Sequence, residues 1–243
     1  MCGRYVSATP PDELARYFGA AAPPPDLYLA PNHNVAPTQT VYAVRERAGA
    51  RVLDTLHWGL VPFWAKDPKI GNRMINARAE TVAHKNAFRV PFTRRRCIIP
   101  ADGFYEWRRL EGSKRKQPMF IGRPDGEPFA FAGLWEKWRD DNSLDADGEP
   151  LELHSCTIIT CEANEAMAAV HDRMPVVLPP GAWDLWLDPV SNDTEAVAGL
   201  LVPAPSSLIR MHPVSTEVNN ARNNGAHLTD RVDPIDVDAA SDR

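Results

Sequence analysis

The first residues of the chain could carry out covalent chemistry. Cys2 follows the initiator Met1, and cysteine is small enough that the methionine is normally trimmed before it. The mature chain would then begin with a free α-amine and a thiol on adjacent carbons. With reference pKa values of about 7.7–8.0 and about 8.5, both groups are partly nucleophilic near neutral pH. Such a 1,2-aminothiol can attack as a thiol with its own amine as base, or it can condense with an aldehyde.

Three polar residues elsewhere in the chain could assist this nucleophile. Asn76 offers an amide that could orient a substrate, Glu106 a carboxyl group for acid–base catalysis, and His171 an imidazole that titrates near neutrality. Each also has an ordinary structural explanation, namely a turn, an ion pair or the cap of a helix. Together with Cys2, however, they supply the groups that a nucleophilic reaction on a carbonyl needs.

The bulk properties predict one domain that works inside the cell. The chain has 243 residues without a repeat or a clear linker, so we expect a single α+β domain. Its 23 prolines favour strands, turns and loops over long helices. No apolar run approaches the roughly 18 residues of a membrane span, and the N-terminus lacks the pattern of a signal peptide. The four cysteines lack CxxC spacing, so we expect a cytoplasmic protein with free thiols and no metal site.

Charge is distributed unevenly along the chain. The net charge is −5, but residues 140–152 carry −6 and the tail from residue 229 carries −3, which leaves +4 on the remainder. Two basic clusters stand out, at residues 85–96 and at residues 108–116. Local field rather than net charge governs phosphate binding, so either cluster could bind a nucleic acid, or each could be a solvated face.

Apolar periodicity and turn signals place the secondary structure. Strands are predicted at residues 40–45, 51–58, 97–100, 102–107, 116–121, 128–135, 155–160, 176–178 and 211–215. Helices are predicted at residues 10–18, 88–92, 162–170, 180–187 and 194–201. Residues 34–37 are expected to form a turn, and the acidic residues 139–150 an exposed hairpin loop. The aromatic segment 58–64 could be core or a platform on which bases stack.

Seven short blocks, in order, resemble one protein family. The blocks are MCGRY at 1–5, NVAP at 34–37, WGLVPFW at 58–64, INARAE at 75–80, PADGFYEW at 100–107, HDRMPVVL at 171–178 and HPVS at 212–215. This pattern is similar to the SOS response-associated peptidase (SRAP) family of abasic-site processing proteins. The resemblance implies one SRAP-like domain at residues 2–228, with a strand-rich, barrel-like core of mixed or antiparallel sheet and a few short flanking helices. An acidic tail at residues 229–243, which we expect to be disordered, would follow.

The resemblance also implies a reaction. Mature Cys2 would form a covalent thiazolidine with the aldehyde of an abasic site in single-stranded DNA, protecting the lesion. Glu106 and His171 would transfer protons, and Asn76 would hold the sugar or the amine. The family is further linked to β-elimination at the lesion and to removal of its own Met1. No cofactor is implied, and we expect a monomer that associates with the nucleoid when bound to DNA.

Carried over by position, the residues expected to contact DNA are Arg4, Pro37, Trp64, Arg78, Lys85, Thr160 and Arg173. Arg4 and Arg78 would bind phosphates, while Pro37 and the loop ending at Trp64 would wedge or stack where the strand bends. Lys85 stands near a place where family members often carry arginine, and lysine binds phosphate only as a point charge. The acidic residues 140–152 should lie away from the DNA groove.

Two other functions remain open from the residues alone. An N-terminal-nucleophile amidohydrolase, such as a glutaminase domain, would use the same amine and thiol on an amide. A non-covalent single-strand binder would not use Cys2 at all. Incubation with abasic DNA followed by a denaturing gel separates these three readings.

Overall fold

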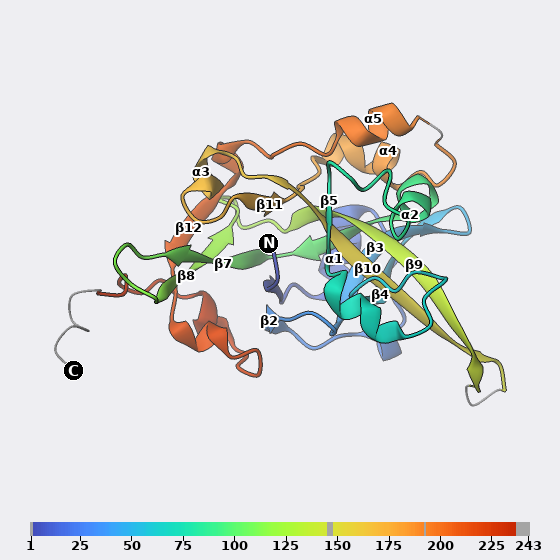
Figure 1. Ribbon diagram of the computed structural model, residues 1–243, viewed down its shortest axis with the longest axis horizontal. Coiled ribbons are helices and arrows are strands. Elements are labelled where there is room, and N and C mark those ends of the chain that lie inside the picture. Colours follow the sequence, from blue (N-terminus) through green and yellow to red (C-terminus); the bar gives the residue numbers. More distant parts are fainter. Residues whose placement is uncertain (1, 145–147, 192, 237–243) are drawn as a thin grey trace.

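The centre of the fold is a closed ring of strands. The computed structural model describes residues 2–144, 148–191 and 193–236. Within these residues five strands pair in the order β10-β4-β3-β6-β9, and β9 pairs with β10 to close a barrel (Figure 1). The ring consists of β3 (Thr40–Arg47), β4 (Ala50–Trp58), β6 (Arg96–Ala101), β9 (Phe129–Leu144) and β10 (Pro150–Glu162). Because β10 and β4 run parallel while the other pairs are antiparallel, the barrel is mixed.

Strands β6 and β9 pack closely against each other. Cys97, Ile98 and Ile99 of β6 are all fully buried, as expected for a strand covered on both faces. A Cβ at Gly133 in β9 would lie 3.0 Å from the sulfur of Cys97, so the glycine allows β6 and β9 to approach.

A second sheet packs beside the barrel and carries the N-terminus. Its order is β12-β8-β7-β1-β2, with all pairs antiparallel. It consists of β1 (Tyr5–Ser7), β2 (Asn32–Val35), β7 (Gly103–Arg109), β8 (Lys116–Gly122) and β12 (Arg210–Pro213). Phe104 of β7 meets Phe129 and Phe131 of β9 edge to face, with ring centroids 6.0 and 5.8 Å apart. These aromatic contacts join the sheet to the barrel.

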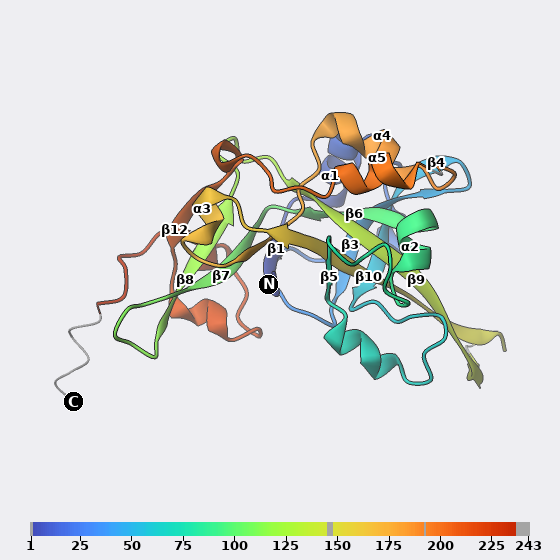
Figure 2. The same cartoon turned by 45° about the horizontal axis from the view of Figure 1, so that its top comes forward.

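Two short strands and several short helices complete the fold. Near its end β10 is paired with β5 (Asn76–Arg78) and with β11 (Arg173–Pro175). The α-helices are α1 (Pro11–Phe18), α2 (Arg89–Arg94), α3 (Glu165–Ala168), α4 (Trp183–Leu187) and α5 (Thr194–Gly199). Figure 2 shows α2, α4 and α5 together on one side of the barrel, where Trp186 donates from its indole nitrogen to the carbonyl of Cys97 at 2.8 Å. None of the helices in the described ranges could cross a bilayer.

The predicted class is confirmed, and some predicted boundaries are wrong. Residues 139–144 and 150–152 are strand rather than loop, because Leu151 and Glu152 pair with Asp140 and Arg139. The predicted helix at 162–170 shrinks to α3, since Glu162 still belongs to β10 and Asn164 caps the helix by accepting from the backbone N–H of Met167. The strand expected at 176–178 lies three residues earlier, as β11.

The start of the acidic tail contacts the second sheet. The backbone N–H of Val232 donates to the carbonyl of Pro213 at 3.0 Å, and that of Ile235 donates to Oε1 of Gln117 at 2.7 Å. Val232 and Ile235 therefore contact the second sheet, while the disorder predicted for the tail stays a prediction. Residues 237–243 lie outside the described part of the chain, and the domain boundary at residue 228 stays a prediction.

Candidate active site

Strand pairing places Cys2 beside Glu106. Tyr5 of β1 is paired with Phe104 of β7, and the backbone N–H of Tyr105 donates to the carbonyl of Arg4 at 2.9 Å. Continuing this antiparallel register toward the N-terminus brings Glu106 next to Gly3, one residue from Cys2. In Figures 1 and 2 the chain accordingly begins at the centre of the molecule, between the two sheets.

Asn76 reaches the same point from the barrel side. β5 runs parallel to β10, with Asn76 opposite Ile158. The side-chain amide of Asn76 donates from Nδ2 to the carbonyl of Cys2 at 2.8 Å. Its other atom, Oδ1, is buried, and within the described part of the chain it has no hydrogen-bond partner. A buried acceptor without a donor is costly, so this oxygen is suited to receive a donor from a ligand or from the chain end.

Burial changes the acidity of both groups at this point. Glu106 is 4% exposed, and burial raises the pKa of its carboxyl group to about 7. The Cys2 side chain is fully buried, and burial followed by the charge of Glu106 raises the pKa of its thiol far above the ordinary value. The pKa of the buried thiol therefore lies above the reference value from which a partly ionised thiol was expected. The thiol is neutral at pH 7, whereas the carboxyl group populates both protonation states.

His171 lies in the turn between α3 and β11. Its Nδ1 accepts a hydrogen bond from the backbone N–H of Arg173 at 3.0 Å, and burial lowers the pKa of the ring. The imidazole is then neutral and carries its proton on Nε2, the tautomer that this backbone donor selects. The Asp172 carboxylate also lies 2.8 Å from Nδ1, a contact that belongs to the protonated ring. Since that carboxylate is 87% exposed, we take the backbone donor to decide the tautomer.

The charge of Lys116 acts on both the imidazole of His171 and the carboxyl group of Glu106. Its charge lowers the pKa of Glu106 and that of His171, although burial is the larger influence on each. Both groups are therefore within electrostatic reach of one lysine at the base of β8. The structure brings Cys2, Asn76 and Glu106 together by contact and register, and places His171 near them.

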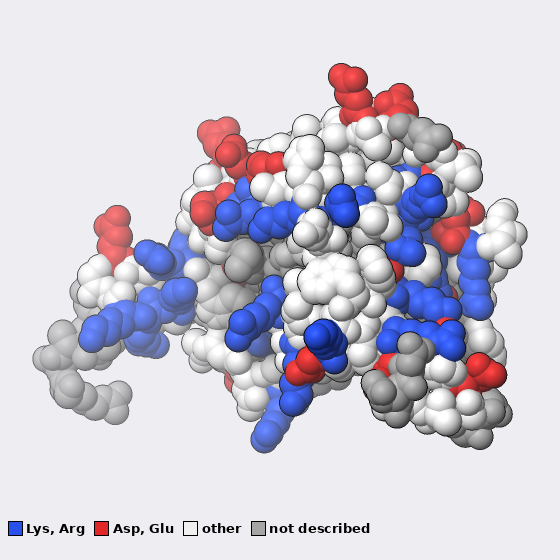
Figure 3. Space-filling view, turned by 45° about the vertical axis from the view of Figure 1, so that its right-hand side comes forward, with Lys and Arg blue, Asp and Glu red and all other residues white. Residues whose placement is uncertain are grey.

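Four of the residues expected to contact DNA are accessible. Trp64 is 48% exposed, Arg78 and Lys85 are exposed, and Pro37 is partly exposed. Phe63 beside Trp64 is 58% exposed, which is unusual for two adjacent large aromatic residues. Figure 3 shows one face of the molecule, on which Lys and Arg side chains are widely distributed and acidic ones lie among them. These residues could meet a ligand without rearrangement.

The other three residues, Arg4, Thr160 and Arg173, form hydrogen bonds or ion pairs with other residues of the chain. Arg4 donates from Nη1 to Oδ1 of Asn34 at 2.8 Å and to the carbonyl of Val218 at 2.7 Å. Arg173 forms a two-pronged ion pair with Glu80, at 2.6 and 3.0 Å, and also donates to the carbonyl of Thr160.

Thr160 is 1% exposed and its hydroxyl donates to the carbonyl of Ala77 at 3.4 Å, so it does not offer a direct contact to DNA. For Arg4 and Arg173, only the donors left over by these partners are available to a phosphate.

Asn34 and Glu80 position residues of the site, and neither was predicted from the sequence to do so. Asn34 is fully buried and donates from Nδ2 to the carbonyls of Val218, Asn220 and Asn223. The only sequence signal was that both residues fall inside blocks shared with the family.

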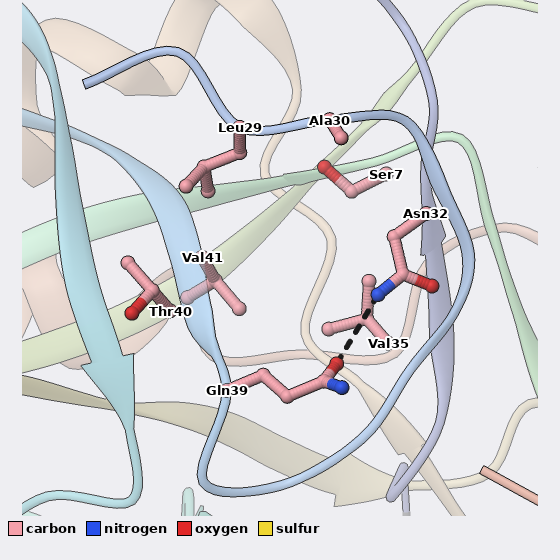
Figure 4. A pocket seen from close by; sticks show the side chains of 8 residues that line it. All are labelled: Ser7, Leu29, Ala30, Asn32, Val35, Gln39, Thr40 and Val41. Atoms are coloured by element: carbon pink, nitrogen blue, oxygen red, sulfur yellow. Dashed lines mark hydrogen bonds between the residues drawn. The ribbon is translucent and has the colours of Figure 1, made fainter. Parts of the chain in front are cut away.

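A cavity of about 200 Å³ adjoins the turn that carries Pro37 (Figure 4). Within it Oε1 of Gln39 accepts from Nδ2 of Asn32 at 3.2 Å and from the backbone N–H of Ala36 at 3.0 Å. The cavity holds none of the four candidate catalytic residues. The Gln39 hydrogen bonds hold the turn that carries Pro37, and we do not assign the cavity as a binding site.

Comparison with known proteins agrees with this geometry. Residues 1–221 match the family model described as SOS response associated peptidase (SRAP). The chain is 44% identical over 230 residues to the abasic site processing protein YoaM of Bacillus subtilis, covering 95% of this chain and 98% of that one. It is 33% identical over 279 aligned positions to the abasic site processing protein HMCES of Pongo abelii, covering 97% of this chain and 77% of that one.

A solved structure supports the fold independently. A crystal structure of a protein from Bacteroides thetaiotaomicron superposes with a TM-score of 0.82 at 24% identity, covering 95% of this chain and 100% of that one. Identity at this level bears on the fold alone. The match of the family model and the identity to YoaM over nearly the whole length together establish that this chain belongs to the SOS response associated peptidase (SRAP) family.

Proposed function

We propose that the mature chain recognises abasic sites in single-stranded DNA and forms a covalent thiazolidine with them through Cys2. The observation that carries the proposal is the position of Cys2, which is held by Asn76 and lies one residue from the point where the register brings in Glu106, whose carboxyl pKa is about 7. The names of the curated relatives, abasic site processing proteins, indicate the class of lesion.

Opening of the abasic sugar is the first step. The closed deoxyribose must gain a proton on its ring oxygen and lose one from the hydroxyl on C1′ to give the aldehyde. A carboxyl group with a pKa of about 7 can do both near neutral pH, because its acid and its base forms are both populated. The Nε2–H of neutral His171 would donate a hydrogen bond to the sugar oxygen.

The amine attacks before the thiol. Removal of Met1 exchanges a peptide nitrogen for a free α-amine, whose N–H groups could donate to the buried Oδ1 of Asn76. The amine adds to C1′, and the adduct loses one water to give an imine. Because burial keeps the Cys2 sulfur protonated, the thiol is unsuited to initiate the reaction.

The thiol then closes the ring. Its sulfur adds to C1′ of the imine while its proton passes, through Glu106, to the nitrogen. The product contains new C–N and C–S bonds, and one water has been released overall. Capture of the imine competes with β-elimination of the 3′ phosphate, which an imine promotes, so a fast thiol step favours protection of the lesion over strand cleavage. Removal of Met1 by the protein itself would be a prior, separate activity.

A denaturing gel tests the proposal against its rivals. Mature protein incubated with a single-stranded abasic oligonucleotide should give a heat-stable shifted band. The band should be missing in Cys2→Ala and in protein that retains Met1. Release of ammonia from glutamine without a shifted band would instead indicate an amidohydrolase. Binding on a native gel that survives Cys2→Ala, without any denaturation-resistant band, would indicate a non-covalent binder.

A further inference from the structure

The hairpin between β7 and β8 is a strongly basic projection. We call residues 108–116, which end β7 and begin β8, the β7–β8 arm. Its turn is tight, since the backbone N–H of Ser113 donates to the carbonyl of Leu110 at 3.2 Å and Gly112 has φ +70°. The arm contains five basic residues and one acidic residue, which are Arg108, Arg109, Lys114, Arg115, Lys116 and Glu111. Lys and Arg side chains accordingly gather on the projection at the left of Figure 3.

These charges are displayed to solvent. Arg109, Lys114, Arg115 and Lys116 are all exposed. No ion pair in the described ranges joins any of them to a carboxylate, whereas the arginines at positions 45, 51, 95 and 173 are all paired. Keeping several like charges together without neutralising partners is unfavourable for the isolated protein. Such a surface therefore matches a ligand that carries repeated negative charge.

The base of the arm lies at the candidate active site. Arg109 is paired with Lys116, and the same two strands pair Glu106 with Met119. Arg109 is three residues from Glu106 along β7, which is roughly 10 Å of extended chain. Lys116 influences the pKa of Glu106, and both Lys116 and Arg109 influence that of His171. The arm thus begins where the lesion would be held and extends away from it.

We propose that the β7–β8 arm binds backbone phosphates of the DNA flanking the lesion, without reading its sequence. This inference rests on the proposed function, because it assigns a second contact region on the same substrate. Leu110, at the turn of the arm, is four residues beyond Glu106, which is roughly 14 Å of extended chain. That length spans several phosphates of a nucleic acid strand. Lysine and arginine on this two-stranded support bind phosphates chiefly through charge, so the contact is independent of base identity.

The test compares two variants that remove the same charge. Lys114→Gln/Arg115→Gln changes the tip of the arm and leaves Lys116, near the catalytic groups, in place. The control Arg16→Gln/Arg47→Gln changes two exposed residues, one on α1 and one at the far end of the β3–β4 hairpin from Trp58. Each variant is titrated with a long abasic oligonucleotide, of about 15 nucleotides on either side of the lesion, and with a short one of about 2, over a series of salt concentrations.

The arm variant should bind the long DNA several-fold more weakly than wild type at low salt. Its salt slope on that DNA should fall by about 1.4, since each lost single-strand phosphate contact removes about 0.7. Cross-linking of the short DNA should be unchanged, and the control should match wild type on both. Equal salt slopes of the arm variant and the control variant on the long DNA would overturn the inference. An equal loss of affinity of the arm variant for the short and the long DNA would overturn it as well. Failure of wild type to cross-link the short DNA would instead refute the proposed function.

Discussion

At the scale of single residues, the site combines a neutral thiol with a carboxyl group poised near neutrality. Sequence composition suggested a Cys2 thiol near its reference acidity, but burial raises its pKa and assigns the first attack to the amine. Burial destabilises the ionised form of the Glu106 carboxyl group. This destabilisation can be measured on the free protein, without DNA.

Replacing Glu106 with Gln should stabilise the folded protein at alkaline pH. The pKa of the carboxyl group is about 7 when folded and about 4.3 when unfolded, so wild-type stability falls as the pH rises between these values and is fully reduced above 7. The variant avoids this loss, so its unfolding free energy at pH 8 should exceed that of wild type by up to about 4 kcal/mol. Urea unfolding at pH 4.5 and at pH 8 measures the difference.

The same variant should cross-link slowly while still binding DNA. A variant no more stable than wild type at pH 8 would contradict the environment described for Glu106. Loss of DNA binding would show that Glu106 has a structural rather than a proton-transfer role.

At the scale of elements, one buried amide ties a distant loop to the N-terminal segment. Asn34, in the edge strand β2, donates to the carbonyls of Val218, Asn220 and Asn223, and its Oδ1 accepts from Arg4, two residues from Cys2. The Arg4 guanidinium also lies 5.9 Å from the ring of Trp107. The segment that carries the nucleophile is therefore positioned by side chains remote in sequence.

Asn34→Ala should destabilise the protein by about 2–3 kcal/mol, because it leaves buried carbonyls without their donor. It should also slow cross-linking, since Arg4 loses one of its acceptors. The exposed Asn72→Ala is a matched control, expected to be close to neutral. Thermal unfolding compares the two variants, and equal melting temperatures would refute the anchoring role of Asn34.

Elements were predictable where local pattern and tertiary pairing agree. The strands predicted at residues 40–45 and 51–58 are present as β3 and β4, and the helix predicted at residues 10–18 is present as α1, because apolar periodicity and turn residues mark them. The acidic hairpin was misread because β9–β10 pairing extends the strands through residues whose composition favours a loop. The partners of Arg4 and Arg173 could not be foreseen, since an arginine's partner depends on which distant strand lies opposite.

At the scale of the whole molecule, acidic and basic regions meet beside the β7–β8 arm. The tail docks through Ile235 onto Gln117, the residue that follows the arm. Asp233 and Asp236 flank that contact and are exposed. Their negative charge lies next to a surface that we assign to phosphate binding, so it should oppose DNA.

Asp233→Asn/Asp236→Asn should therefore tighten binding of long abasic DNA by a few-fold at low salt. The gain should shrink as salt rises, because screening weakens interactions between exposed charges. Two exposed acidic residues on α1, changed as Asp12→Asn/Glu13→Gln, serve as the control. Fluorescence anisotropy measures the affinities, and identical effects of the two variants would contradict a local influence of the tail.

The central claim is that one terminal residue supplies both nitrogen and sulfur to the abasic aldehyde. Intact mass spectrometry of the complex tests it most directly, with and without borohydride. Mature wild type should give the summed mass of protein and DNA less one water, stable without reductant. Cys2→Ala, which keeps the amine, should give a stable adduct only after borohydride traps the imine. A stable adduct in Cys2→Ala without reductant, or no wild-type adduct at all, would contradict the account.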